Sequence, residues 1–94
     1  MTLEERVAKA LRLSSAAAEK LKDEINANIQ TARAELIRMG CQKDVAESEH
    51  VLVQEAIVTY CQKEMGAPDL YERYESAWLF QAENIRRSTL EAGG

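Results

Sequence analysis

The apolar positions of the chain are densest between Val51 and Cys61. At helical spacing these side chains cover well over half of the circumference and leave a narrow polar strip near Glu55, Thr59 and Gln62. Such a helix must be buried on several sides. A domain of 94 residues buries a modest fraction of its surface, so contacts with neighbouring subunits are one way to complete this burial.

The first half of the chain predicts two amphipathic helices. Thr2 and Glu5 have the spacing of a capping box, which predicts a short helix that ends near Leu13. A longer helix begins after one of the serines at positions 14 and 15 and keeps its apolar residues on one face as far as Met39. Gly40 then provides a C-terminal stop.

The second half of the chain predicts two more helices. Asp44 and Glu47 are a second candidate capping box, so we expect the hydrophobic helix to run from Val45 to Met65 and to end at Gly66. A fourth helix follows, with its apolar and aromatic residues on one face: Leu70, Tyr71, Tyr74, Ala77, Trp78, Ala82 and Ile85. Residues from about 88 to 94 are expected to form a flexible tail.

These predictions together give an all-α fold in a single domain, residues 1–94. We expect a small bundle of four helices, one short and three longer, with a frayed C-terminal tail. The composition agrees, because 46% of the residues are hydrophobic and there are only one proline and four glycines. The alternation typical of strands does not persist anywhere in the chain.

The charge and hydropathy of the chain exclude several kinds of partner. The net charge is −4 with both signs interspersed, so no basic surface for direct nucleic-acid recognition is expected. No apolar stretch approaches the roughly 20 residues of a membrane span. The N-terminus lacks the pattern of a signal peptide, and we therefore expect a cytoplasmic protein without a membrane partner.

Residues that could support catalysis or metal binding do not form a recognisable motif. His50 is the only histidine and is interpreted as a surface residue near the start of a helix. Cys41 and Cys61 lack the close spacing of paired thiolate ligands, and Cys61 is interpreted as a core residue. The glycines form no phosphate-binding loop. We expect no enzyme activity, cofactor, metal or small-molecule substrate.

Some residues are left over once a monomer core has been assigned. Leu79 and Phe80 lie off the apolar face of the fourth helix. The apolar candidates for contacts between subunits are Val51, Val58, Leu79 and Phe80. Arg86 and Arg87 are further candidates, since they could pair with acidic groups of a partner, although arginines at a helix end also stabilise the helix dipole.

Residues 54–61, closed by Gly66 and followed by residues 69–74, resemble the small head-tail connector proteins of long-tailed bacteriophages and prophages. These are also called head-completion, adaptor or DNA-packaging proteins. In that family an A-I-x-x-Y helix that ends in glycine precedes a helix with an E-R-Y-x-x-x-[YW] pattern, which here reads from Glu72 to Trp78. The resemblance covers roughly residues 3–87.

One segment departs from the pattern of the family. Relatives often begin the third helix with a proline after an acidic residue, whereas this chain has Ser48, Glu49 and His50 there. The start of the third helix therefore stays open.

The resemblance implies a structural protein of the virion without an active site. Such connectors form a homo-oligomeric ring, dodecameric in the virion, beneath the portal protein, where they extend the DNA channel and seat a stopper or tail-completion protein. DNA would be passing cargo, and an acidic chain suits such a channel because it repels phosphates. The implied location is the head-tail interface, with the host cytoplasm during assembly, and the isolated protein could be a monomer.

Two other classes of function stay open. A small bacterial helical adaptor or regulator could dimerise through the same leftover apolar residues. An enzyme has the weakest support, since no nucleophile, base, metal cluster or phosphate loop converges in the sequence.

Overall fold

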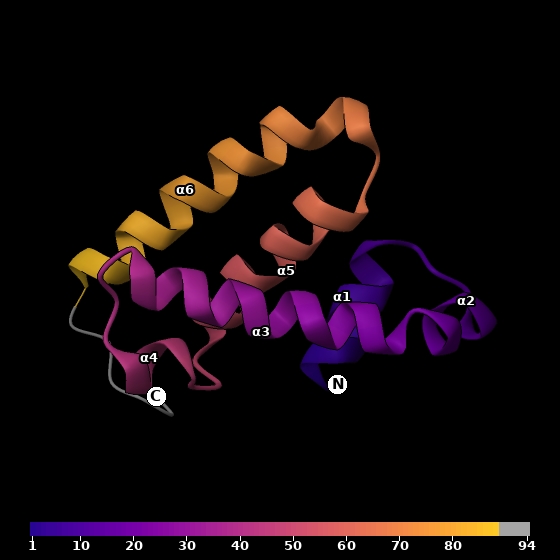
Figure 1. Cartoon of the computed structure of the whole chain (residues 1–94), viewed down its shortest axis with the longest axis horizontal. Coiled ribbons are helices and arrows are strands. Elements are labelled where there is room, and N and C mark those ends of the chain that lie inside the picture. Colours follow the sequence, from indigo (N-terminus) through magenta and orange to yellow (C-terminus); the bar gives the residue numbers. More distant parts are fainter. Residues whose placement is uncertain (89–94) are drawn as a thin grey trace.

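The all-α class is confirmed by the structure, a computed structural model that describes residues 1–88 (Figure 1). The helices are α1 (Leu3–Ala10), α2 (Ser15–Lys20), α3 (Lys22–Arg38), α4 (Lys43–Ala46), α5 (Val51–Met65), the 3-10 helix η1 (Pro68–Leu70) and α6 (Tyr71–Arg87). These described residues contain no strand. Except for Ser88, the tail that we expected to be flexible lies outside the described residues.

Helix α5 forms the centre of the hydrophobic core. Val53 and the six residues 56–61 are buried, and α6, α3 and α1 all contact this helix. The ring of Tyr60 packs edge-on against Trp78 of α6, with 4.9 Å between the ring centroids. Facing side chains complete the core: Val7, Ile25, Ile29, Ala32, Leu36, Ala82 and Ile85. Most of the expected burial of this helix is therefore achieved within one chain, whereas Val51 and Leu52 in its first turn stay exposed.

The N-terminal half contains the expected capping box and one unexpected interruption. Thr2 and Glu5 bond reciprocally at the start of α1, as predicted. The helix predicted to run to Met39 is divided at Leu21, whose φ of −96° and ψ of 8° lie outside the helical range. The peptide N–H of Leu21 still donates to Ala17 O at 3.0 Å, so the helical hydrogen bond at this residue is kept. The spacing of apolar residues continues across the interruption and therefore did not predict it.

The helix predicted from Val45 to Met65 is wrong at its start. Its first part is the short helix α4, and α5 begins only at Val51. The predicted capping box of Asp44 with Glu47 does not form, because Asp44 Oδ1 accepts a bond from the adjacent N–H of Val45. Instead, the imidazole Nδ1 of His50 accepts the N–H of Leu52 at 3.1 Å and caps α5.

Arg33 of α3 provides the physical reason for this division. Its guanidinium Nη1 donates to the carbonyl oxygen of Ala46 at 2.9 Å and to that of Ser48 at 3.0 Å. The hydroxyl of Ser48 donates to the carbonyl of Val45 at 2.7 Å. Side chains thus satisfy the carbonyl groups that a continuous helix would have used, and the chain can turn between α4 and α5.

The last two helices form an antiparallel pair joined by a tight connection. Gly66 ends α5 as predicted, and it must be glycine because a Cβ there would lie 2.4 Å from the carbonyl oxygen of Gln62. Trp78, Ala82 and Ile85 lie buried on α6, whereas Tyr71 and Ala77 of the predicted face are exposed. Figure 1 shows α6 along the upper edge of the molecule, with α5 below it and α3 crossing the lower half.

Candidate interaction surface

Several large apolar side chains remain exposed within residues 1–88: Met1, Ile37, Val51, Leu52, Tyr71, Leu79 and Phe80. Four of them form two pairs of sequence neighbours. Val51 and Leu52 are exposed at the start of α5, and Leu79 and Phe80 are exposed on α6, where Phe80 keeps 69% of its surface accessible. We call the first pair the α5 patch and the second the α6 patch. Leu52 was missed because it lies within the run interpreted as core. Val58 was predicted to be left over, and this was wrong, since it is 9% exposed and belongs to the core.

Phe80 points away from the core of its own chain. Trp78 is buried against α5, and two residues further along a helix the side chain is turned by about 200°. Arg73 and Arg87 are two turns before and two turns after Phe80, on the same outward face, and both are exposed. An aromatic ring between arginines is the composition that protein interfaces favour at their energetic centres.

The two arginines at the end of α6 converge on one carboxylate. Arg86 Nε donates to Glu83 Oε2 at 3.0 Å, and Arg87 Nε donates to Glu83 Oε1 at 2.7 Å. The hydrogen bond from Arg86, followed by that from Arg87, lowers the pKa of Glu83 to about 2. Two positive charges share one negative charge, so this end of α6 stays basic although the chain is acidic. The predicted pairing of Arg86 and Arg87 with a partner is not tested by these contacts.

Arg86 also lies across the turn that ends α3. Gly40 has a φ of +107°, which favours glycine, and a Cβ at this position would lie 3.0 Å from Cδ of Arg86. The side chain of Arg86 is therefore held in place by its own chain. Arg87 is the more exposed of the two arginines, with 73% of its side chain accessible against 40% for Arg86.

A groove lies between α1, α2 and α3 at a distance from the α6 patch. It has a volume of about 230 Å³ and is lined by Glu4, Glu5, Ala8, Ser15, Ala18, Glu19, Lys22 and Ile25. We call it the N-terminal groove. Its apolar lining comes from Ala8, Ala18 and Ile25, and its charged lining consists of three carboxylates and one ammonium group. The sequence alone did not indicate this groove, because its residues come from three helices whose packing sets their distance.

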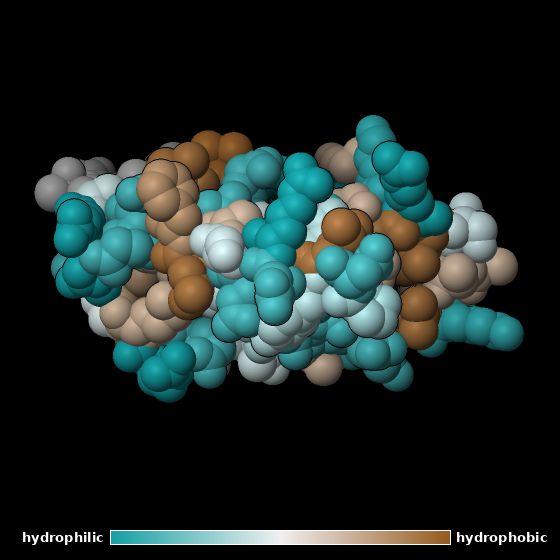
Figure 2. Space-filling model, turned by 90° about the horizontal axis from the view of Figure 1, so that it is seen from above, coloured by the Kyte–Doolittle hydropathy of each residue, from teal (hydrophilic) through white to brown (hydrophobic). Residues whose placement is uncertain are grey.

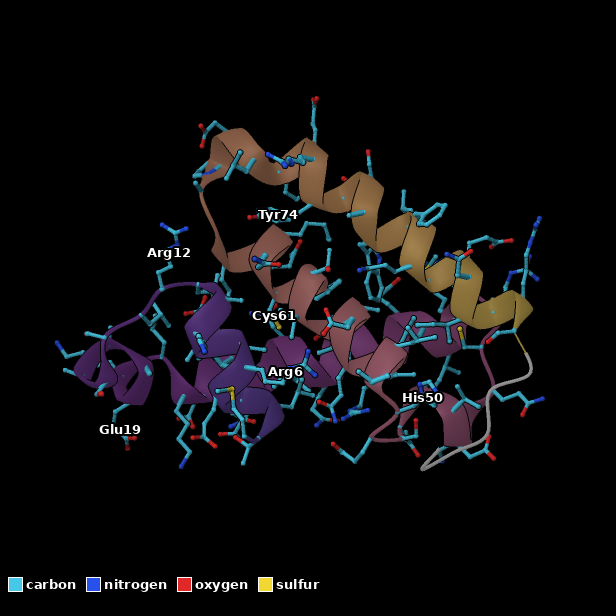
Figure 3. All side chains as sticks on the ribbon, turned by 180° about the vertical axis from the view of Figure 1, so that it is seen from behind. Arg6, Arg12, Glu19, His50, Cys61 and Tyr74 are labelled. Atoms are coloured by element: carbon cyan, nitrogen blue, oxygen red, sulfur yellow. The ribbon has the colours of Figure 1, made fainter. Side chains whose placement is uncertain are left out.

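A second hollow lies where the end of α1 meets the connection between α5 and α6. It has a volume of about 400 Å³, and among its lining residues Arg12 is the only charged one. Arg12 has a φ of +58°, unusual for a residue with a side chain, and ends α1 in a left-handed conformation. Figure 3 shows Arg12 on the loop after α1 and Tyr74 on α6, on either side of this region.

Within residues 1–88 the two cysteines are buried, and the one histidine caps a helix. Burial raises the pKa of the Cys61 thiol to about 12 and also raises the pKa of Cys41. His50, at the base of α5 in Figure 3, is occupied as the helix cap. Residues 1–88 hold no group of three or more His, Cys, Asp or Glu side chains placed to bind a metal ion. The surface feature best suited to binding is therefore the α6 patch, whose apolar side chains lie between charged residues.

The hydropathy of the surface is mixed. In Figure 2 apolar residues appear as separate brown areas among hydrophilic residues on the face seen from above. Within residues 1–88, none of the helices combines the length and the apolar character that crossing a membrane requires.

The chain matches no protein-family model, no curated protein sequence and no solved structure. Its function is therefore inferred from its own residues and surfaces.

Proposed function

We propose that this chain is a head-tail connector subunit of a long-tailed phage or prophage. It assembles as a ring under the portal protein, extends the DNA channel and joins the head to the stopper or tail-completion protein. The observation that carries the proposal is the outward-facing Phe80 with Leu79 on α6, in a chain whose core is complete without them. The resemblance in residues 54–78 supplies the class of protein.

A ring subunit in a stack of rings needs lateral contacts with its neighbours and axial contacts with other proteins. The α5 patch and the α6 patch lie on different helices, which supports at least two kinds of contact from one chain. Val51 and Leu52 lie next to the loop that Arg33 and His50 hold in place, so the α5 patch is presented on a fixed support. A fixed surface loses less entropy when it binds.

The charge of the chain supports a conduit rather than a DNA clamp. A net charge of −4 on each copy repels the phosphates of a passing genome. The basic arginines of α6 border the exposed Phe80, so we expect them to face protein rather than DNA.

The test mixes the purified protein with portal rings from the same genome and follows them by light scattering and negative-stain electron microscopy. We expect rings, or saturable decoration of the portal at one copy per portal subunit. Leu79→Asp or Phe80→Asp should impair assembly while the helical content stays unchanged, whereas Ala34→Asp, on an exposed site of α3, should not. A stable two-fold dimer that ignores the portal would contradict the proposal and favour the adaptor or regulator.

A further inference from the structure

We propose that two copies of this chain join head to tail, with Phe80 of one copy seated in the N-terminal groove of the next. The inference rests on the proposed function, because it specifies how adjacent subunits of the ring meet. It assigns a donor surface, the α6 patch, and an acceptor surface, the N-terminal groove, to the same polypeptide.

The shapes of the two surfaces fit this assignment. Phe80 is 69% exposed and projects from the outward face of α6. The N-terminal groove offers about 230 Å³ with apolar side chains from Ala8, Ala18 and Ile25. A cavity of about 150 Å³ is enough to bind benzene in a protein interior, so this groove has room for a phenyl ring. Seating Phe80 there removes from water an aromatic surface that the monomer leaves exposed.

The charges of the two surfaces are complementary. On the donor surface Arg73 and Arg87 flank Phe80, and Glu83, one turn after Phe80, pairs with Arg87, so these three side chains sum to +1. The charged residues of the acceptor groove are Glu4, Glu5, Glu19 and Lys22, which sum to −2. Docking therefore brings basic side chains toward an acidic rim, and such complementarity speeds encounter and fixes register.

The other hollows fit a basic donor less well. The hollow at the end of α1 has Arg12 as its only charged lining residue, which would repel Arg73 and Arg87. The hollow between α1 and α3 on the other side of Glu4 has apolar lining from Leu3 and Ile29, but its charged residues, Glu4, Arg33 and Glu49, sum to only −1. A further hollow, at the N-terminal end of α1, carries the two positive charges of Arg6 and Lys9. The N-terminal groove, at −2, therefore has the most negative lining of these four.

The positions of the two surfaces allow contact between copies but not within one copy. In Figure 1 α6 forms the upper edge and α2 lies at the lower right, and in Figure 3 Glu19 lies at the end of the molecule away from the last turns of α6. Two different surfaces that bind each other form a heterologous interface, which closes into a ring or continues as a filament. This is the symmetry that a connector ring requires.

The experiment uses two variants that each lose one half of the contact. Phe80→Asp removes the donor, and Ala18→Trp fills the groove. Each alone should weaken self-association by about 30-fold or more, the effect typical of an interface hot spot, in sedimentation velocity at concentrations up to millimolar. An equimolar mixture should form dimers that do not grow, because the groove of the Phe80→Asp copy still accepts the ring of the Ala18→Trp copy.

Controls separate loss of contact from loss of folding. Circular dichroism must show native helicity for each variant, and if Ala18→Trp unfolds, Glu19→Lys on the exposed rim takes its place. Ala34→Asp and Glu47→Lys introduce the same charges at exposed sites elsewhere and should leave self-association unchanged.

Failure of this proposal and failure of the proposed function give different results. A mixture without dimers, or a wild-type protein that stays monomeric at millimolar concentration, overturns the Phe80 contact. If that wild-type protein still decorates the portal, the connector function stands with another interface between subunits. If it neither self-associates nor binds the portal, both proposals are wrong.

Discussion

Replacing Arg33 by alanine should destabilise the chain more than any loss of a surface ion pair. The guanidinium of Arg33, whose side chain is largely buried, donates to the carbonyl groups of Ala46 and Ser48 at 2.9 and 3.0 Å. A hydrogen bond from a charged donor contributes about 1.5–3 kcal/mol. Water can reach part of this loop after the change, so we take the lower end for both bonds and expect a loss of about 3 kcal/mol.

The ion pair between Arg33 and Glu49 contributes little to this figure. Its closest N···O distance is 3.5 Å and the Glu49 side chain is 71% exposed, so solvent screens the interaction. Glu49→Gln is therefore a matched control that removes the charge and keeps the two carbonyl bonds of Arg33. Its expected cost is below about 0.5 kcal/mol.

Urea denaturation followed by circular dichroism measures both changes. Arg33→Ala should shift the midpoint to lower urea with an unchanged slope, and hydrogen exchange should accelerate first between residues 46 and 52. The reasoning is refuted if Arg33→Ala costs no more than Glu49→Gln. That result would mean that water replaces the guanidinium without loss and that the α4–α5 connection does not depend on α3.

Three further predictions concern single side chains. Cys61 should resist iodoacetamide at pH 8 in the folded protein and react in urea, because burial raises its pKa to about 12; rapid native labelling would contradict this. Arg12→Gly should raise the melting temperature by a few degrees. A residue with a side chain pays roughly 1–2 kcal/mol for a left-handed conformation, whereas the greater chain entropy that glycine loses on folding costs only roughly 0.5–1 kcal/mol. A lower melting temperature would refute this reasoning. Glu83 has a folded pKa of about 2, below its usual value of 4.5, so its contribution to stability is present above about pH 4.5 and lost as the pH falls toward 2. Acid titrations of Glu83→Gln should lack this part of the wild-type decline.

The parts of the fold that local chemistry determines were predictable from the sequence. Thr2 with Glu5 at the start of α1, Gly40 after α3 and Gly66 after α5 lie where capping and helix-stop patterns placed them. Each signal involves residues within one or two turns of each other. The all-helical class follows from the same short-range patterns together with the scarcity of glycine and proline.

The parts that depend on distant residues were not predictable. The division between α4 and α5 depends on Arg33, which lies 13 and 15 positions before its two acceptors and belongs to another helix. The N-terminal groove depends on how α1, α2 and α3 pack, and its lining spans residues 4–25. The apolar pattern of a single helix carries no signal for either feature.

Val58 shows why the distinction between core and interface matters for testing the proposed function. An aspartate there would place a charge among buried side chains, which costs several kcal/mol and would unfold the subunit before its assembly could be measured. Because α1, α3 and α6 cover α5 within one chain, the residues that stabilise the fold differ from the exposed residues that we propose for assembly. Phe80, outside the core, can therefore be changed to test assembly alone, and a folded monomer in solution is compatible with a ring that forms only on a portal.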